Sequence, residues 1–97
     1  MAAYVVIQVN VTDEEKYEAY KKLTPASVEK YGGRFLVRGG AQEDLEGALK
    51  YSRMVLLEFS DLDRAKQWYN SPEYQEAKAL RAGASTGIFT VVEGAEG

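Results

Sequence analysis

Residues 30–40 read KYGGRFLVRGG, and this stretch decides how the rest of the chain is arranged. Its centre, residues 34–38, is predicted to be a short strand bracketed by two Gly-Gly pairs. The first pair ends the helix predicted before it, because glycine adopts the left-handed conformation that closes a helix. The second pair turns the chain after the strand.

The side chains of this strand are expected to alternate between two faces of a sheet. Phe35 and Val37 are predicted on one face, and Arg34, Leu36 and Arg38 on the other. The segment would therefore place two arginines on one sheet face.

The composition is that of an ordinary globular domain, with 45% hydrophobic and 28% charged residues among 97. One domain over residues 1–97 is expected. The net charge of −3, with basic residues scattered, argues against nucleic acid as a partner. No apolar run is long enough to cross a membrane, and the first ten residues lack a basic signal-peptide region. We therefore expect a cytoplasmic protein with no membrane partner.

Two residue types are absent, and their absence restricts the chemistry. The chain contains no cysteine and no histidine. It therefore lacks a disulfide framework, the commonest general base, the commonest zinc ligand and every Ser-His or Cys-His pair. We expect no metal site and no cofactor.

Hydrophobic patterning and capping signals predict four strands and two helical regions. The strands are expected at residues 4–11, 34–38, 53–59 and 88–92. A capping box, Thr12 with Glu15, opens the first helix, and Pro25 is expected to kink it or divide it in two. The second helical region begins at Ser60 and restarts at Ser71, and residues 39–51 form a loop.

This order, βαββαβ, predicts an α+β ferredoxin-like fold with a four-stranded antiparallel sheet. In this topology both helical regions cover one sheet face and leave the other uncovered. The uncovered face is too apolar to remain in water, which predicts a homodimer in which two such faces pack together. Its expected members are Tyr4, Val6, Gln8, Asn10, Arg34, Leu36, Arg38, Met54, Leu56, Glu58, Ile88, Thr90 and Val92.

The polar members of this face are the candidate site. Glu58 lies in an apolar run and, buried without a partner, would suit a general base. The alternative is that Glu58 forms a structural cross-strand ion pair with Arg34, if Arg38 lies opposite Met54. Arg38, beside a glycine turn, could bind a carboxylate or a developing enolate, or could be a solvated residue at a strand end.

Other ligand contacts are expected from Tyr4, Gln8, Asn10 and Trp68. The tyrosines and Trp68 could line an aromatic pocket. Their alternative role is packing, since a stripe such as Tyr17 and Tyr20 is typical of a core with hydroxyls at its rim.

Several motifs resemble one known family. These are Tyr17 with Tyr20, the stretch KYGGRFLVRGG, Leu57-Glu58-Phe59, Ala65 with Trp68-Tyr69, the run SPEYQ at residues 71–75, Arg81 and Val92-Glu93-Gly94. In order and spacing they resemble the bacterial domain of unknown function 1330 family. The resemblance implies the fold of the dimeric α/β barrel group, but it carries no catalytic residues.

Three functions compete at this point. The first is a cofactor-free enzyme, an isomerase or a monooxygenase, that acts on a small anionic or carbonyl compound between the sheets. In it Arg38 would bind the anionic oxygen and Glu58 would move a proton. The second is a binding module for a small metabolite, and the third is a structural homodimer without a ligand.

Overall fold

The computed structural model describes residues 1–48 and 50–95 as three helices and four strands. In chain order these are β1 Ala3–Val11, α1 Glu14–Lys30, β2 Arg34–Arg38, β3 Arg53–Phe59, α2 Leu62–Tyr69, α3 Pro72–Leu80 and β4 Ser85–Glu93. Residue 49 of the predicted loop and residues 96–97 of the predicted domain lie outside the described residues.

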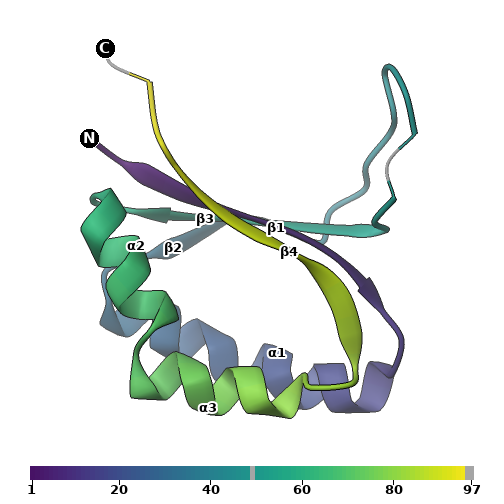
Figure 1. Ribbon diagram of the computed structural model, residues 1–97, viewed down its shortest axis with the longest axis horizontal. Coiled ribbons are helices and arrows are strands. Elements are labelled where there is room, and N and C mark those ends of the chain that lie inside the picture. Colours follow the sequence, from purple (N-terminus) through teal and green to yellow (C-terminus); the bar gives the residue numbers. More distant parts are fainter. Residues whose placement is uncertain (49, 96–97) are drawn as a thin grey trace.

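The four strands form one antiparallel sheet in the order β2-β3-β1-β4. All three helices lie on one side of this sheet, and its other side carries no element (Figure 1). The predicted βαββαβ order and the ferredoxin-like fold are therefore confirmed, with the second helical region divided into α2 and α3.

The helices begin at residues that offer a side-chain oxygen to the first turn. Ser71 caps α3 as predicted, by accepting from the Tyr74 amide. The other two predicted caps are each displaced by one residue, to Asp13 for α1 and Asp61 for α2. The amides of Thr12 and Asp13 both donate to the Ala84 carbonyl, at 2.7 and 3.1 Å, and the side chain of Asp13 accepts from the Lys16 amide in the first turn of α1.

Pro25 lies inside α1, which is one continuous helix, so of the two predicted outcomes the division into two pieces is wrong and the kink stays a prediction. Proline has no amide hydrogen, so the carbonyl of Lys21, four residues earlier, loses its normal helical donor. Arg38 Nη2 donates to that carbonyl at 2.8 Å. A side chain from β2 thus supplies the hydrogen bond that Pro25 cannot make.

The core lies between the helices and the sheet. Along β1 the buried residues alternate with partly exposed ones, and on β3 Val55, Leu57 and Phe59 are buried in the same way. The helices contribute large aromatic side chains, of which Trp68 and Tyr74 are fully buried. Gly33 has no side chain because the Phe59 ring occupies the place of a β-carbon.

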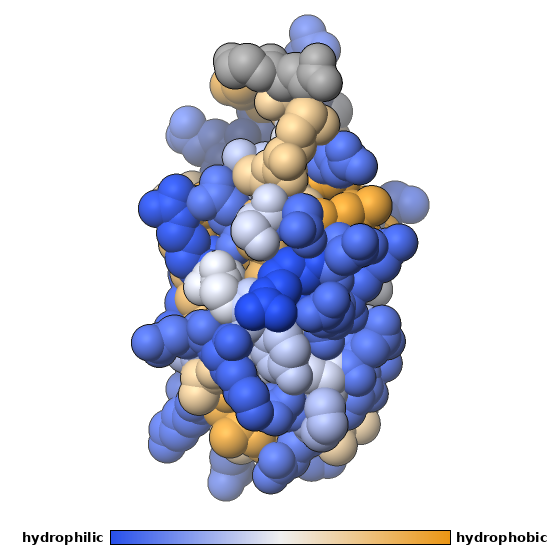
Figure 2. All heavy atoms as spheres, turned by 90° about the vertical axis from the view of Figure 1, so that its left-hand side faces the viewer, coloured by the Kyte–Doolittle hydropathy of each residue, from blue (hydrophilic) through white to orange (hydrophobic). Residues whose placement is uncertain are grey.

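The uncovered sheet face keeps exposed apolar side chains. Leu36, Ile88 and Val92 are 42%, 49% and 49% exposed. The end of the molecule at α2 is different, since its surface is mostly hydrophilic with small separate apolar spots (Figure 2). The uncovered face therefore carries three of the six large apolar residues that are exposed among the described residues.

None of the helices within residues 1–48 and 50–95 has the length and hydrophobicity needed to cross a membrane. The cytoplasmic location expected from the sequence stays a prediction.

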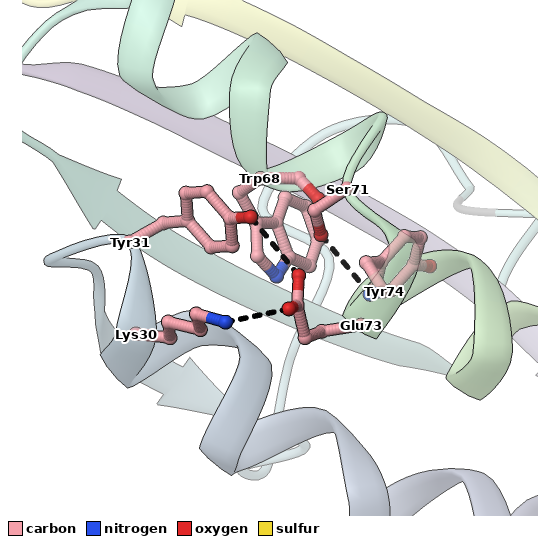
Figure 3. Close-up of polar contacts among 6 residues, drawn as sticks. All are labelled: Lys30, Tyr31, Trp68, Ser71, Glu73 and Tyr74. Carbon is pink, nitrogen blue, oxygen red and sulfur yellow. Dashed lines mark hydrogen bonds and ion pairs between the residues drawn. The ribbon is translucent and has the colours of Figure 1, made fainter.

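Glu73 joins the end of α1 to the start of α3. Its carboxylate accepts from Lys30 Nζ at 2.6 Å and from the Tyr31 hydroxyl at 2.9 Å (Figure 3). The hydrogen bond from Lys30, together with those from its own amide and from Tyr31, lowers the pKa of Glu73 from 4.5 to about 2. A lowered pKa in the folded state means that the ionised carboxylate stabilises the fold.

Replacement of Glu73 by Gln should therefore change how stability depends on pH. The contribution of Glu73 is complete above pH 4.5 and is lost as the pH falls toward 2. We expect the free energy of unfolding to fall less steeply between pH 5 and pH 3 in Glu73→Gln than in the wild type. Urea unfolding at several pH values measures this slope. Glu76→Gln, an exposed change in the same helix, is the control, and an equal effect of both substitutions would contradict the assignment.

Candidate functional site

A layer of aromatic rings fills the space between the helices and the strands β3, β1 and β4. The Trp68 and Tyr74 ring centroids are 4.3 Å apart, and Tyr69 lies 5.3 Å from Tyr74. Phe59 of β3 lies 5.4 Å from Trp68, and Phe89 of β4 lies 6.1 Å from Tyr69. Trp68 and Tyr74 at the centre of this layer are fully buried.

A hydrogen-bonded cluster of Tyr20, Tyr74 and Arg81 lies within this layer. The hydroxyl oxygens of Tyr20 and Tyr74 are 3.0 Å apart, and Arg81 Nη2 donates to the Tyr74 hydroxyl at 3.4 Å. The Arg81 guanidinium stacks 4.5 Å from the Phe89 ring centroid and 5.6 Å from that of Tyr20. Its Nε is buried and has no acceptor among the described residues.

Burial raises the pKa of both the Tyr20 and the Tyr74 hydroxyl above the ordinary value of 10.0. Both phenols are therefore neutral near pH 7 and act as hydrogen-bond donors or acceptors, not as bases. Arg81 is a permanent cation beside them. The cluster can stabilise an oxygen on which negative charge develops.

An apolar hollow of about 250 Å³ lies between α2 and β4, next to this cluster. Tyr69 and Phe89 connect the two, because they line the hollow and their rings contact Tyr74 and Arg81 of the cluster. The remaining lining residues are Val5, Ala65, Lys66, Trp68, Asn70, Thr90 and Val91. The mixture of aromatic walls with a few polar groups is typical of a site for a small molecule.

The predicted site residues are divided between the two faces of the sheet. Tyr4, Gln8, Arg34 and Glu58 lie on the uncovered face, as expected. Arg34 is paired with Glu58 in the strand register, and its Nε donates to the Glu58 carboxylate at 2.7 Å. The ion-pair alternative is therefore confirmed. Roles of these four residues in ligand binding or proton transfer stay predictions.

The predicted position of Arg38 on the uncovered face is wrong. A bulge between Phe35 and Val37 inserts one extra residue into β2, so that Arg38 pairs with Val55 instead of Met54. Val55 is buried beneath the helices, and Arg38 follows it to that side, where its guanidinium lies 4.7 Å from the Phe35 ring centroid. Arg38 and Glu58 consequently lie on opposite faces and do not form one site.

Asn10 and Trp68 have structural contacts. Asn10 Nδ2 donates to the Lys50 carbonyl, and its Oδ1 accepts from the Ser52 amide, both at 2.8 Å, so it attaches the loop to β1. Trp68 is fully buried under the helices, and its Nε1 donates to Ser27 Oγ at 3.1 Å. Trp68 still lines the α2–β4 hollow, so its predicted role in ligand binding remains open on the helix side.

The cluster of Tyr20, Tyr74 and Arg81 was not predicted. The tyrosine stripe of α1 was interpreted as core with hydroxyls at the rim, whereas the Tyr20 hydroxyl lies inside and meets Tyr74 from α3. The only signal for it was that Tyr20, Tyr74 and Arg81 all belong to the motifs that carry the family resemblance. The contact among these three residues depends on how α1 packs against α3, and the hydrophobic periodicity of the sequence does not define that packing.

A metal centre is not supported by the arrangement of ligands. Within residues 1–48 and 50–95, no three His, Cys, Asp or Glu side chains gather closely enough to hold an ion.

Comparison with known proteins identifies the family of this chain. Residues 2–95 match the pattern of the family described as domain of unknown function DUF1330. The chain belongs to this family. No curated protein sequence matches it.

Several solved structures share the fold. A protein of unknown function from Rhodopseudomonas palustris has a TM-score of 0.80 at 16% identity, with 99% of this chain and 84% of that chain covered. A dimeric ferredoxin-like protein of unknown function from Jannaschia sp. CCS1 has a TM-score of 0.71 at 14% identity, covering 96% and 99%. SnoaB, a cofactor-independent oxygenase from Streptomyces nogalater, has a TM-score of 0.67 at 13% identity, covering 99% and 95%. At these low sequence identities, the similarity to the solved structures is a similarity of fold.

Proposed function

We propose that this DUF1330 protein is a cofactor-independent enzyme, of the oxygenase or isomerase type, for a small aromatic compound with a phenolic or carbonyl oxygen. One observation carries the proposal: a donor cluster of two buried tyrosines, Tyr20 and Tyr74, and the partly exposed Arg81 lies next to an apolar hollow of about 250 Å³. The substrate ring would pack against Tyr69 and Phe89, with its oxygen directed toward Arg81.

Both reaction types require stabilisation of a negative charge on a substrate oxygen. An isomerase transfers a proton from the carbon beside a carbonyl to a water molecule and forms an enolate. A cofactor-free oxygenase transfers the proton of a phenol to water, so that the ionised substrate itself supplies electrons to dioxygen. In each case negative charge develops on one oxygen, and a preorganised donor contributes roughly 10²–10³ in rate. Arg81 would stabilise that oxygen through charge, and Tyr74 through its hydroxyl.

The oxygenase reaction balances without a cofactor. A phenol with a free para position and one dioxygen molecule give a quinone and water, with the substrate oxidised and dioxygen reduced. The fold shared with SnoaB supports this type of reaction for the chain.

Turnover of simple probes tests the proposal. We expect the protein to convert 1-naphthol to 1,4-naphthoquinone with oxygen uptake, or to accelerate keto–enol exchange of phenylpyruvate. Arg81→Met and Tyr74→Phe should lower the rate at least tenfold, since each removes a donor from the developing oxyanion. Arg64→Met, an exposed change on α2, should not.

The outcomes separate the three functions. Binding of a probe without turnover, weakened by Arg81→Met, would mean a binding module. The absence of both binding and turnover would contradict a ligand site between α2 and β4 and favour a structural protein.

We also propose that the chain forms a homodimer through its uncovered sheet face. Leu36, Ile88 and Val92 are exposed there, and the Arg34–Glu58 ion pair lies on the same face. Pairing of two such faces would remove this apolar surface from water. Solved structures with this fold that are described as dimeric support the arrangement.

Light scattering after size exclusion should return twice the chain mass of 10.8 kDa at micromolar concentration. Ile88→Glu should shift the protein toward monomer, because it places a charge in the apolar interface. Leu80→Glu is the matched control, since Leu80 is an exposed apolar residue on α3. A monomeric wild type, or equal effects of the two substitutions on the measured mass, would contradict a dimer through the uncovered face.

A further inference from the structure

A second hollow, polar rather than apolar, lies beside the N-terminal half of α1. It measures about 230 Å³ and is lined by Val11, Glu14, Tyr17, Lys21, Gly39, Ser52 and Arg53. A narrower hollow of about 20 Å³ shares Tyr17, Lys21 and Arg53 with it and adds Arg38. Neither hollow includes Tyr69 or Phe89, so this region is separate from the α2–β4 hollow.

Arg53 is the centre of this region. It pairs with Val9 in the sheet register and therefore faces the helices, where its guanidinium lies 5.7 Å from the Tyr17 ring centroid. Its Nε is buried and has no acceptor among the described residues. Gly39, with a φ of +70°, leaves room for the guanidinium, because a β-carbon there would clash with Arg53 Nη1.

Arg38, although exposed, approaches the same region because the β2 bulge turns it to the helix side of the sheet. One of its five N–H donors is used on the Lys21 carbonyl. Within residues 1–48 and 50–95, neither Arg38 nor Arg53 forms an ion pair. A buried guanidinium nitrogen without an acceptor is costly unless another group supplies one.

The local charges favour an anion. Arg38, Arg53 and Lys21 provide three positive charges. The carboxylates nearby are Glu14, which lines the hollow, and Glu18, which is bound to Lys21 Nζ at 2.8 Å. Three cations against two carboxylates leave the region positive in a protein whose net charge is −3.

We propose that this polar hollow binds the oxyanion group of a small molecule, a carboxylate or a phosphate, through Arg53 and Arg38. The fork of a guanidinium matches both groups, and the bound oxygens would supply the acceptor that Arg53 Nε lacks. The site does not depend on the reaction proposed for the α2–β4 hollow.

Titration with malonate and with inorganic phosphate, at constant ionic strength kept with sodium chloride, tests the site. The observed signals are the Arg Nε–H resonances of ¹⁵N-labelled protein. We expect saturable shifts of the Arg53 resonance with at least one anion. Tighter malonate binding would indicate a carboxylate ligand, and tighter phosphate binding a phosphate ligand.

Variants define which residues hold the anion. Arg53→Met keeps an apolar stem and should weaken the affinity at least tenfold, measured on backbone amide resonances near Gly39. Arg38→Met removes an exposed guanidinium and provides the same test if Arg53→Met does not fold. Arg64→Met removes one positive charge elsewhere and should leave the affinity unchanged. Linear, unsaturated shifts, or equal weakening by Arg64→Met, would overturn the proposal.

Discussion

The bulge in β2 between Phe35 and Val37 is the constraint on which the helix side of this molecule depends. One extra residue reverses the alternation after it and turns Arg38 beneath the helices. There Arg38 donates to the Lys21 carbonyl, which Pro25 has left without a helical donor. The bulge and the proline therefore complement each other, and together they fix α1 against the edge of the sheet.

The aromatic layer explains why the polar groups gather on this side. One long helix and two short ones cover the sheet face with the help of large side chains, and each tyrosine ring brings a hydroxyl into the core. The Tyr20 and Tyr74 hydroxyls form a hydrogen bond with each other. The Nε atoms of Arg53, at the start of β3, and of Arg81, at the end of α3, have no acceptor among the described residues. Arg53 lines the polar hollow, whereas Arg81 stacks on Phe89, which lines the apolar hollow.

The sequence was sufficient for the order of elements and the sheet faces of three strands, because these follow from local alternation. The Arg34–Glu58 pair was one of two alternatives for Glu58, and it forms although the register assumed for it, Arg38 opposite Met54, is not the one observed. It was insufficient for Arg38, because RFLVR contains no glycine or proline that signals a bulge. Two helix caps were displaced by one residue, to Asp13 and Asp61, because Thr12-Asp13 and Ser60-Asp61 each offer two adjacent residues that favour the cap position. The cluster of Tyr20, Tyr74 and Arg81 depends on the packing of α1 on α3, which no single segment encodes.

The position of the Arg38 side chain is the most direct test of this account. Nuclear Overhauser effects in isotope-labelled protein report which protons lie within about 5 Å of its δ-protons and Nε–H. The account predicts contacts with the Phe35 ring and with α1 near Lys21. Contacts with Met54 and Glu58 instead would place Arg38 on the uncovered face, remove the bulge and contradict the arrangement of the helix side.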